Sequence, residues 1–523
     1  MNDPALPLAW PADAAARTLS ARRQAVMAAM AISFLWLAAT AWLRPLTLPD
    51  EGRYAGVALE MLRSGHWAVP TLDGLPFFHK PPLFYWITAG AMSLFGQVEW
   101  AARLASLLAA ALGAGAIYAL VHRWSGRRMA RLTLLVLLTQ PLWFIGAQFA
   151  DMNMLVAGCI SATIALLAHA ALKMRDGLPW RRALLAAYAF AALGVLAKGL
   201  IGAVIPALVM LVWLATLKRW HTVMALLWAP GIAVFIAIAV PWFARMQWEF
   251  PGFLHYFIVV QHFARFALGG FNNAEPFWFY PVALTALSLP WVAWLGLALK
   301  RGYWQRVSQE PVLALMWAWL AVVVVFFSLP QSKLIGYVLP AVPPLACLIA
   351  DAAARVRTSR LRATAALAAV LCLGVVAGVA WHPLATNRHM AKALAARRLP
   401  SEPVFFIDDY FYDLPFYADL HAPPLVVDDW ASPEMLMHDN WRHELADAAA
   451  FVPRTGASQL IGDAALAARL CAATRLSWVI ATDAVAPRYP FLKWAEAIER
   501  GNDSTLWRVD RRSPLIARSL GCH

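Results

Sequence analysis

The stretch MNMLVAGCISATIALLAHAAL, residues 152–172, decides the class of fold, because it holds no charged side chain over its whole length. A transmembrane helix needs roughly 20 consecutive, mostly apolar residues, and this stretch meets that length. With 61% hydrophobic residues and 26 Trp among 523 residues, the chain is too apolar for a soluble core. These features indicate a polytopic membrane protein.

Similar apolar runs lie on both sides of this stretch. They are found near residues 27–45, 101–122, 130–147, 183–197, 199–217, 222–244, 276–299, 311–328, 333–350 and 361–381. We therefore predict an all-α polytopic membrane bundle, which accounts for residues 1–381. Two segments of this domain, 46–100 and 245–275, are long and amphipathic, and we expect them to fold on its outer side.

The net charge of +14 is concentrated in the apolar part of the chain. Residues 1–381 carry 29 Lys and Arg against 13 Asp and Glu, whereas residues 382–523 carry 15 against 17. Short loops and tails at alternate span ends hold 20 of those 29 basic residues. They are Arg17, Arg22, Arg23, Arg123, Arg127, Arg128, Arg131, Lys173, Arg175, Arg181, Arg182, Lys218, Arg219, Lys300, Arg301, Arg306, Arg355, Arg357, Arg360 and Arg362. This distribution argues for a membrane topology signal and against a nucleic-acid partner.

The same charges predict the orientation of the chain. The positive-inside rule places these loops and the N-terminus in the cytoplasm and residues 382–523 outside. Because the basic N-terminal segment leads into a long first span without a small-residue cleavage site, we expect it to remain as an anchor.

The C-terminal part is predicted to be a small extracytoplasmic α/β domain spanning residues 382–523. Short β-type runs occur in VFFIDD (404–409), PLVVDD (424–429) and SWVIAT (477–482), separated by Ala-rich helical stretches. Cys471 and Cys522 both fall in this domain, where an oxidising compartment would let them pair, and the sequence leaves open whether they do. The other three cysteines, Cys159, Cys347 and Cys372, fall in apolar spans and are expected to be buried thiols.

The first outer segment contains two predicted helices. In DEGRYAGVALEMLRSG, residues 50–65, Asp50 is a candidate N-cap and Gly65 a candidate end of the helix. Asp50 and Glu51 are consecutive, so their side chains diverge by about 100° on a helix and cannot share a proton. A purely structural role, in which Asp50 caps the helix and Glu51 complements its dipole, remains an alternative. The stretch PPLFYWITAGAMSLFG, residues 81–96, predicts a second helix with Pro in its first turn.

Outside the basic loops and the C-terminal domain, charged side chains gather on the predicted outer face. They are Asp50, Glu51, Arg53, Lys80, Asp151, Lys198, Arg245, Arg265 and Lys333. Charges beside hydrocarbon are costly and usually functional, although Lys and Arg can also snorkel to the interface. Lys80 lies before two prolines that favour an extended backbone, which suits a phosphate ligand.

Other candidate residues are expected to meet on helical faces. His255, His262 and Arg265 share one face by their spacing, and Lys333 lies one turn from Tyr337. The sequence holds no P-loop, no GxGxxG and no Cys metal motif. We therefore expect no nucleotide cofactor and infer a phosphorylated lipid substrate, already activated, at the outer face.

Six short motifs of this chain resemble those of a known family. They are PDEGRYA (49–55), FFHKPPLFYW (77–86), FADMNM (149–154), VVQHFARF (259–266), PFWFY (276–280) and SKLIGYVLPAVPPLA (332–346). Their order and content resemble GT-C membrane glycosyltransferases, in particular the bacterial 4-amino-4-deoxy-L-arabinose lipid A transferases and the protein O-mannosyltransferase superfamily. The resemblance implies a GT-C bundle of about 11 to 13 transmembrane helices.

The resemblance also implies roles for individual residues, to which we add neighbours from the same motifs. The expected catalytic residues are Asp50 and Glu51; the donor-phosphate ligands are Lys80, Arg265, Tyr337 and Lys333; the metal-associated residues are His262 and His79; and the cavity residues are Asp151, Arg53 and Tyr54. The family typically has Glu where this chain has His79, directly before Lys80. Two histidines could still hold a zinc ion, and this departure points to a divergent branch with a different sugar.

The expected activity is transfer of a sugar, aminoarabinose-like or other, from undecaprenyl phosphate to a lipid A phosphate on the periplasmic face of a bacterial inner membrane. Asp50 would act as base or orienter, depending on the acceptor. We expect a monomer whose other partners are membrane lipids. One alternative is a protein O-glycosyltransferase with the same donor class. Another is a transporter of lipid-linked sugar, for which ionisable residues near the midplane and broken helices are typical.

Overall fold

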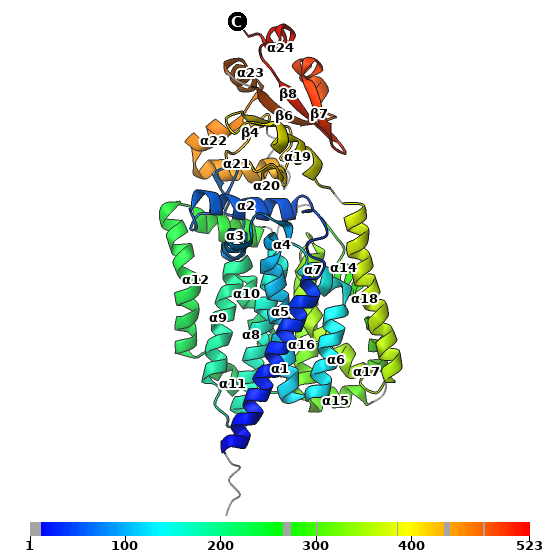
Figure 1. The fold of residues 1–523 in the computed structure, drawn as a ribbon. Helices are drawn as coiled ribbons and strands as arrows, with labels where there is room; N and C mark the ends of the chain where they lie inside the picture. Colours follow the sequence, from blue (N-terminus) through cyan, green and yellow to red (C-terminus); the bar gives the residue numbers. More distant parts are fainter. Residues whose placement is uncertain are drawn as a thin grey trace, which may run out of the picture.

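The computed structural model describes residues 12–264, 273–299, 302–383, 385–432, 440–473 and 476–522. A helical bundle forms its lower part and a small domain with one sheet covers one end of the bundle (Figure 1). The helices of the bundle are α1 (Ala12–Ala38), α5 (Leu104–Trp124), α6 (Arg127–Thr139), α7 (Pro141–Ala147), α8 (Met152–Arg175), α9 (Arg181–Lys198), α10 (Ile201–Thr216), α11 (Trp220–Leu226), α12 (Ala229–Glu249), α14 (Phe279–Leu287), η2 (Trp291–Leu299), α15 (Tyr303–Gln309), α16 (Pro311–Ser328), η3 (Ile335–Ala341), α17 (Val342–Ala353) and α18 (Thr358–Trp381).

Six helices of the described chain are long and apolar enough to cross a membrane, or eight if each of two bent pairs forms one span. The six are α5, α8, α12, α16, the continuous run Ile335–Ala353, and α18. This confirms the predicted class, an all-α polytopic bundle. The decisive stretch 152–172 lies within α8, which packs between α5 and α9 at the centre of the bundle.

Two predicted spans are broken rather than straight. The run 130–147 is divided between α6 and α7 with a bend of 66°, and the run 276–299 between α14 and η2 with a bend of 115°. Helix α7 begins at Pro141 and η2 directly follows Pro290, and a proline cannot extend the hydrogen-bond ladder of the preceding helix. Apolar composition alone does not report such a bend.

Between the bundle and the domain lies a layer formed mainly by residues 50–102. It consists of α2 (Asp50–Ser64), a hairpin of β1 (Thr71–Leu72) and β2 (Leu75–Pro76), α3 (Leu83–Phe95) and α4 (Glu99–Ala102), with η1 (His255–Ala264) nearby. Helix α2 crosses the end of the bundle in Figure 1. It ends before Gly65, whose φ of 70° is the left-handed conformation that glycine adopts most easily, as predicted.

The predicted N-cap of α2 was wrong by one position. Asp50 is the first helical residue and Pro49 precedes it as the cap, without a side-chain hydrogen bond. The carboxylate of Asp50 is therefore not used to cap this helix.

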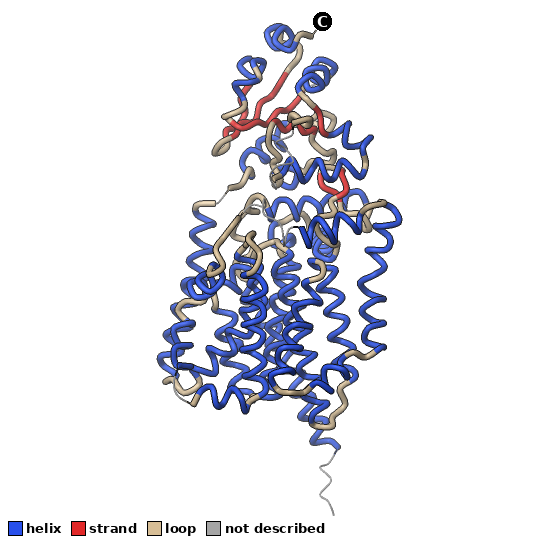
Figure 2. The backbone as a smooth tube through the Cα atoms, turned by 180° about the vertical axis from the view of Figure 1, so that it is seen from behind, coloured by secondary structure: helices blue, strands red, loops and turns tan. Residues whose placement is uncertain are grey.

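The C-terminal part is the predicted small α/β domain. Its elements are α19 (Arg388–Arg397), β3 (Val404–Ile407), α20 (Leu414–Tyr417), β4 (Leu425–Val427), α21 (Trp441–Phe451), α22 (Pro453–Gln459), β5 (Leu460–Ile461), α23 (Asp463–Ala472), β6 (Ser477–Thr482), η5 (Ala486–Arg488), η6 (Pro490–Trp494), β7 (Glu496–Arg500), β8 (Ser504–Val509) and α24 (Pro514–Leu520). The sheet order is β5-β4-β3-β6-β8-β7, parallel from β5 to β6 and antiparallel from there on. Figure 2 shows the strands of this sheet in red, gathered in the small domain beyond the end of the bundle. A disulfide joins Cys471 to Cys522, which resolves the open pairing, and Cys159, Cys347 and Cys372 are buried and free, as expected.

The domain meets α2 through a backbone contact. A Cβ atom at Gly52 would lie 2.8 Å from the backbone N of Asp413 and 3.0 Å from the carbonyl carbon of Tyr412. Only glycine allows this approach, so the first turn of α2 is pressed directly against the C-terminal domain.

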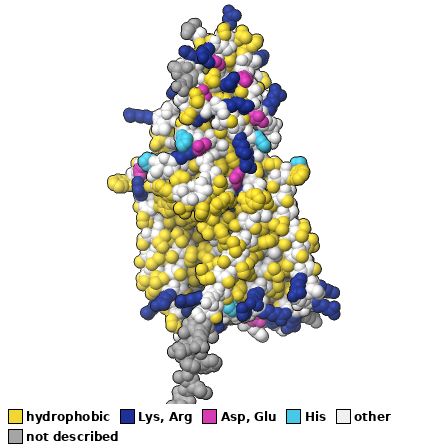
Figure 3. All heavy atoms as spheres, in the orientation of Figure 1, with side chains coloured by type: hydrophobic (Ala, Val, Ile, Leu, Met, Phe, Trp, Pro, Cys, Tyr) yellow, Lys and Arg dark blue, Asp and Glu magenta, His cyan; other side chains and the backbone are white. Residues whose placement is uncertain are grey.

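The charged side chains are distributed unevenly between the two ends of the molecule. Lys and Arg side chains gather at the end of the bundle opposite the domain, and a broad hydrophobic belt lies between the two ends (Figure 3). The pattern agrees with the charge argument made from the sequence. The orientation in a membrane stays a prediction.

Candidate active site beneath the C-terminal domain

Arg53, in the first turns of α2, lies between two carboxylates. Its Nη1 is 3.2 Å from Oε1 of Glu444 and 3.9 Å from Oδ1 of Asp50. The guanidinium also lies 4.8 Å from the centre of the Tyr412 ring. Asp50 remains 38% exposed while Glu444 is 6% exposed, so one carboxylate is accessible and the other is buried.

His79 reaches the same buried carboxylate from the loop before α3. Its Nδ1 lies 3.6 Å from Oε1 of Glu444, and its ring stacks on Phe77 with centroids 4.9 Å apart. Lys80 follows it and is half-buried, immediately before the two prolines that precede α3. The predicted FFHKPP motif is thus part of the same cluster as Arg53.

Two tyrosines continue the cluster toward the bundle. Tyr54 and Tyr85 are buried, with ring centroids 6.4 Å apart. Burial raises the pKa of Tyr54 well above its usual value, and the nearby charge of Asp50 adds to the shift. The Tyr85 hydroxyl has no hydrogen-bond partner among the described residues. These hydroxyls are neutral donors that a phosphate or sugar oxygen could accept from.

Asp151, from the motif FADMNM, stands at the start of α8. Its Oδ1 accepts a hydrogen bond from the backbone N–H of Asn153 at 2.9 Å. The Asn153 side chain donates to Asp151 and accepts from the ammonium of Lys198. Lys198 in turn lies 4.1 Å from the ring centre of Tyr337. A cation therefore connects Asp151 with the predicted phosphate ligand Tyr337.

The motifs PDEGRYA and FADMNM, about a hundred residues apart in the sequence, meet at one site, because the backbone N–H of Ala150 donates to Glu51 at 2.8 Å. Burial raises the pKa of Asp151; the charge of Lys198 opposes that shift, and the charge of Asp50 adds to it.

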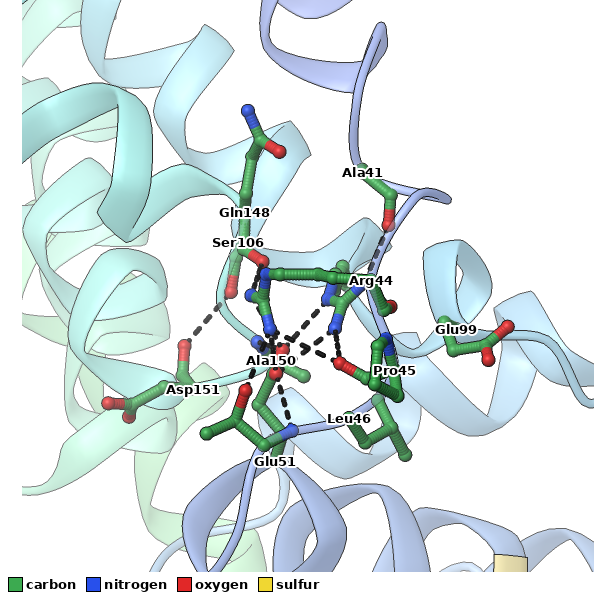
Figure 4. Close-up of polar contacts among 12 residues, drawn as sticks. Ala41, Arg44, Pro45, Leu46, Glu51, Glu99, Ser106, Gln148, Ala150 and Asp151 are labelled. Atoms are coloured by element: carbon green, nitrogen blue, oxygen red, sulfur yellow. Dashed lines mark hydrogen bonds and ion pairs between the residues drawn. The ribbon is translucent and has the colours of Figure 1, made fainter. Parts of the chain in front are cut away.

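Glu51 has a different environment from Asp50. It is fully buried, and Arg103 donates to it from Nε at 2.8 Å and from Nη2 at 3.0 Å. Figure 4 shows Arg44 and Ala150 beside the Glu51 carboxylate. Arg44 donates from both terminal nitrogens, and the backbone N–H groups of Thr47 and Ala150 donate at 2.9 and 2.8 Å. Burial alone would raise the pKa of Glu51, but the charges of Arg103 and Arg44 and their hydrogen bonds lower it to about 2.

These contacts give Glu51 a structural role. Both of its oxygens are fully used as hydrogen-bond acceptors, so we do not retain Glu51 as a catalytic residue. Through Ala150 it fixes the residue before Asp151, and it is itself the residue after Asp50. The Ser106 hydroxyl adds a hydrogen bond of 3.0 Å to the Asp151 carbonyl oxygen. One buried carboxylate therefore holds both candidate acids in a fixed relation.

Lys333 also has a structural environment. It is 3% exposed, and its Nζ donates to the carbonyl oxygens of Glu275 at 2.6 Å and Pro330 at 2.5 Å. The predicted shared helical face with Tyr337 was wrong, because η3 begins only at Ile335, beyond Lys333. We therefore do not retain Lys333 as a phosphate ligand.

Two predicted site residues lie outside this description. Arg265 is not among the described residues, and for His262 the helix η1 is described but not the side chain. Within the described residues, no group of three or more His, Cys, Asp or Glu side chains is arranged to hold a metal ion. The zinc ligands His79 and His262 stay a prediction.

Comparison with known proteins identifies the family. A protein from Aeromonas salmonicida described as undecaprenyl phosphate-alpha-4-amino-4-deoxy-L-arabinose arabinosyl transferase is 30% identical over 492 residues, which cover 90% of this chain and 88% of that protein. The chain belongs to this arabinosyl transferase family. A member from Erwinia tasmaniensis is 32% identical over 369 residues, or 67% of this chain, and there the chain spans just under two thirds, 66%, of the relative's length.

A family model and solved structures agree with this membership. Residues 79–244 match the model of the dolichyl-phosphate-mannose-protein mannosyltransferases. The crystal structure of ArnT from Cupriavidus metallidurans bound to undecaprenyl phosphate has a TM-score of 0.74 at 24% identity, covering 94% of this chain and 98% of that one. An archaeal oligosaccharyltransferase from Archaeoglobus fulgidus has a TM-score of 0.50 at 13% identity, covering 90% and 71%. The transferase fold is thereby established for the whole described bundle and domain.

Sequence reasoning missed several residues of this candidate site. Lys198 was noticed only as one of several charges on the outer face. Glu444 and Tyr412 come from the C-terminal domain, in which no site residue was expected. The sequence around Glu444, WRHELADAAAF, is typical of an ordinary amphipathic helix. Only the docking of the domain brings Glu444 and Tyr412 next to Arg53.

Proposed function

We propose that this protein transfers a sugar of the 4-amino-4-deoxy-L-arabinose class from undecaprenyl phosphate to a phosphate of lipid A. The observation that carries the proposal is the convergence of Asp50, Arg53, His79 and Asp151 at one end of a bundle of this family. The relatives' names include undecaprenyl phosphate and the amino sugar, and a solved structure of the same fold is bound to undecaprenyl phosphate.

The transfer exchanges one carbon–oxygen bond for another. The bond between the anomeric carbon and the donor phosphate breaks, and an oxygen of the acceptor phosphate forms the new bond to that carbon. Undecaprenyl phosphate leaves with the bonding electrons and the added negative charge. Lys80, Tyr337 and Arg265 are proposed to hold this phosphate, with Lys198 beside Tyr337 adding a further positive charge.

Asp50 is proposed to orient the acceptor more than to deprotonate it. A phosphate monoester has a second pKa of about 6, so it is largely ionised at neutral pH and needs no general base. The partly exposed carboxylate of Asp50, restrained by Arg53, can instead hold a hydroxyl or amino group of the sugar or acceptor. With a hydroxyl acceptor, the same carboxylate would have to accept the proton.

No step of the proposed transfer depends on a metal ion. Among the described side chains, His79 and Glu444 are the two donors at the predicted place, and a zinc site requires three or four protein ligands.

We further propose that the protein is a monomer of the bacterial inner membrane, with a cytoplasmic N-terminus and a periplasmic site and C-terminal domain. The gathering of Lys and Arg at the opposite end of the bundle supports this orientation (Figure 3).

A protein O-glycosyltransferase is the second candidate, favoured by the match of residues 79–244 to a protein mannosyltransferase model. A transporter is less favoured: two helix pairs are indeed bent, but α2, which carries Asp50 and Arg53, lies at the end of the bundle beside the domain rather than at its middle (Figure 1).

One comparison tests these functions. Lipid A mass spectra are recorded for wild-type cells, a deletion strain and the strain complemented with the gene. The proposal expects a mass difference equal to one amino-sugar residue that disappears on deletion and returns on complementation. Unchanged lipid A together with lost protein glycans would establish the second candidate instead.

A further inference from the structure

Helix α21 carries a carboxylate from the C-terminal domain into the site. Glu444 lies in its first turns and is 5% exposed. The helix is anchored in its own domain: Asn440 caps it by accepting from the N–H of His443 at 3.0 Å, and Arg442 bonds Asp408 and Asp428. These two aspartates directly follow strands β3 and β4, so the sheet fixes where Glu444 points.

Both oxygens of Glu444 bind groups of the site. Oε1 faces Nη1 of Arg53 at 3.2 Å and Nδ1 of His79 at 3.6 Å, and Oε2 accepts from the Tyr412 hydroxyl at 2.5 Å. Arg53 has its second carboxylate, Asp50, at 3.9 Å on the same nitrogen. Glu444 therefore holds the cation that restrains Asp50.

Docking of the domain does not by itself require Glu444. One turn further along α21, Asp447 accepts from the Tyr256 hydroxyl at 2.9 Å and so ties the same helix to η1. The backbone contact at Gly52 adds a further attachment, between the domain and α2. These attachments hold the domain without a buried acid at position 444. Burying a charge is costly unless it is well paired, so the Glu444 carboxylate facing Arg53 and His79 calls for a role beyond docking.

We infer that Glu444 is a positioning residue of the transferase, through which the C-terminal domain fixes Arg53, and with it Asp50, and sets the charge next to His79. The inference rests on the proposed function. It means that the site is complete only when the domain is docked.

The first test compares two variants of one helix, Glu444→Gln and Asp447→Asn, in the purified full-length protein. Because a small displacement of a reacting group costs about 100-fold in rate, we expect Glu444→Gln to lower kcat by about 10- to 100-fold with little change in the donor KM. Asp447→Asn should keep the wild-type kcat. Wild-type kcat in Glu444→Gln, or an equal loss in both variants, would overturn the inference.

The second test moves the carboxylate to the other side of the contact. Since Nδ1 of His79 lies 3.6 Å from Oε1 of Glu444, the double variant His79→Glu/Glu444→Gln returns one carboxylate to the contact that Glu444 leaves. We expect its kcat to exceed that of His79→Gln/Glu444→Gln, which changes the same two positions without supplying a carboxylate, whereas a merely structural defect would give equal values. No recovery in a double variant whose thermal unfolding matches the wild type would contradict the inference.

The assay also separates this inference from the proposed function. Wild-type protein is supplied with undecaprenyl phosphate-aminoarabinose and lipid A. An inactive wild type refutes the proposed function, whereas an active wild type with a fully active Glu444→Gln variant refutes only the role of Glu444.

Discussion

Asp50 and Glu51 are neighbours in the chain with opposite environments. Asp50 is partly exposed beside Arg53, while Glu51 is enclosed by two arginines. The sequence already excluded a shared proton, because consecutive helical side chains diverge. It did not show which of the two points inward, since that depends on Arg44 and Arg103, which reach Glu51 from outside α2.

The proposed role of Asp50 predicts the effect of Asp50→Asn. With a phosphate acceptor we expect kcat to fall by about 10-fold, and with a hydroxyl acceptor by about 100-fold or more, because only the second reaction needs a base. Steady-state rates with lipid A and with a hydroxyl-bearing analogue measure the difference. Full modification of lipid A in cells carrying this variant would show that Asp50 takes no part in the reaction.

Glu51→Gln should act on stability before it acts on catalysis. The substitution leaves two buried guanidinium groups without their carboxylate, and breaking such a pair costs about 3–5 kcal/mol. Thermal unfolding in detergent should show a clear drop, whereas Glu496→Gln, at an exposed ion pair with Arg508, should change little. Equal unfolding temperatures for Glu51→Gln and the wild type would refute the structural role.

The same residue predicts a pH dependence. The pKa of Glu51 is lowered from 4.5 to about 2 in the folded protein, so its stabilising contribution is complete above pH 4.5 and is lost as the pH falls toward 2. Part of the acid destabilisation of the wild type should therefore be missing in Glu51→Gln. Unfolding temperatures measured between pH 6 and pH 3 test this, and parallel curves would contradict it.

At the scale of elements, local sequence predicted most helices of the bundle. The apolar runs became α5, α8, α16 and α18 because length and composition suffice for a span. The end of α2 at Gly65 could also be predicted from the local sequence. The bends at Pro141 and Pro290 were visible as prolines, but their size depends on neighbouring helices.

Other element-scale predictions failed for a related reason. Lys333 and Tyr337 were assigned to one helix from their spacing, yet the backbone before Ile335 is extended and binds the Lys333 ammonium through carbonyl groups. Similarly, the contact of α21 with α2 joins segments that are far apart in sequence. No pattern within either segment predicts this contact.

The close approach of α2 to the domain predicts the effect of Gly52→Ala. In a free helix this change stabilises by about 1 kcal/mol, but here the new Cβ would lie 2.8 Å from a backbone nitrogen. We expect a lower unfolding temperature and reduced kcat. Gly90→Ala in α3, where nothing lies within 4 Å of the new Cβ, is the matched control and should be neutral or stabilising. A neutral Gly52→Ala would show that the domain can move away from α2.

At the scale of the whole molecule, the charge distribution predicts which side each end faces. Cys159, Cys347 and Cys372 are buried and Cys471 is bonded to Cys522, so an introduced cysteine will dominate labelling. In intact spheroplasts, an impermeant maleimide should label His421→Cys on the C-terminal domain but not Ser308→Cys in α15. The reverse pattern would invert the proposed topology.

The disulfide between Cys471 and Cys522 keeps the C-terminal domain in one piece after cleavage of its backbone. The bonded pair encloses β6, β7, β8 and α24, which include the centre and one edge of the sheet. If a protease nicks the backbone anywhere between the two cysteines, both pieces stay joined to the membrane anchor. The injured enzyme would therefore migrate as a single band on a gel until a reductant separates the pieces.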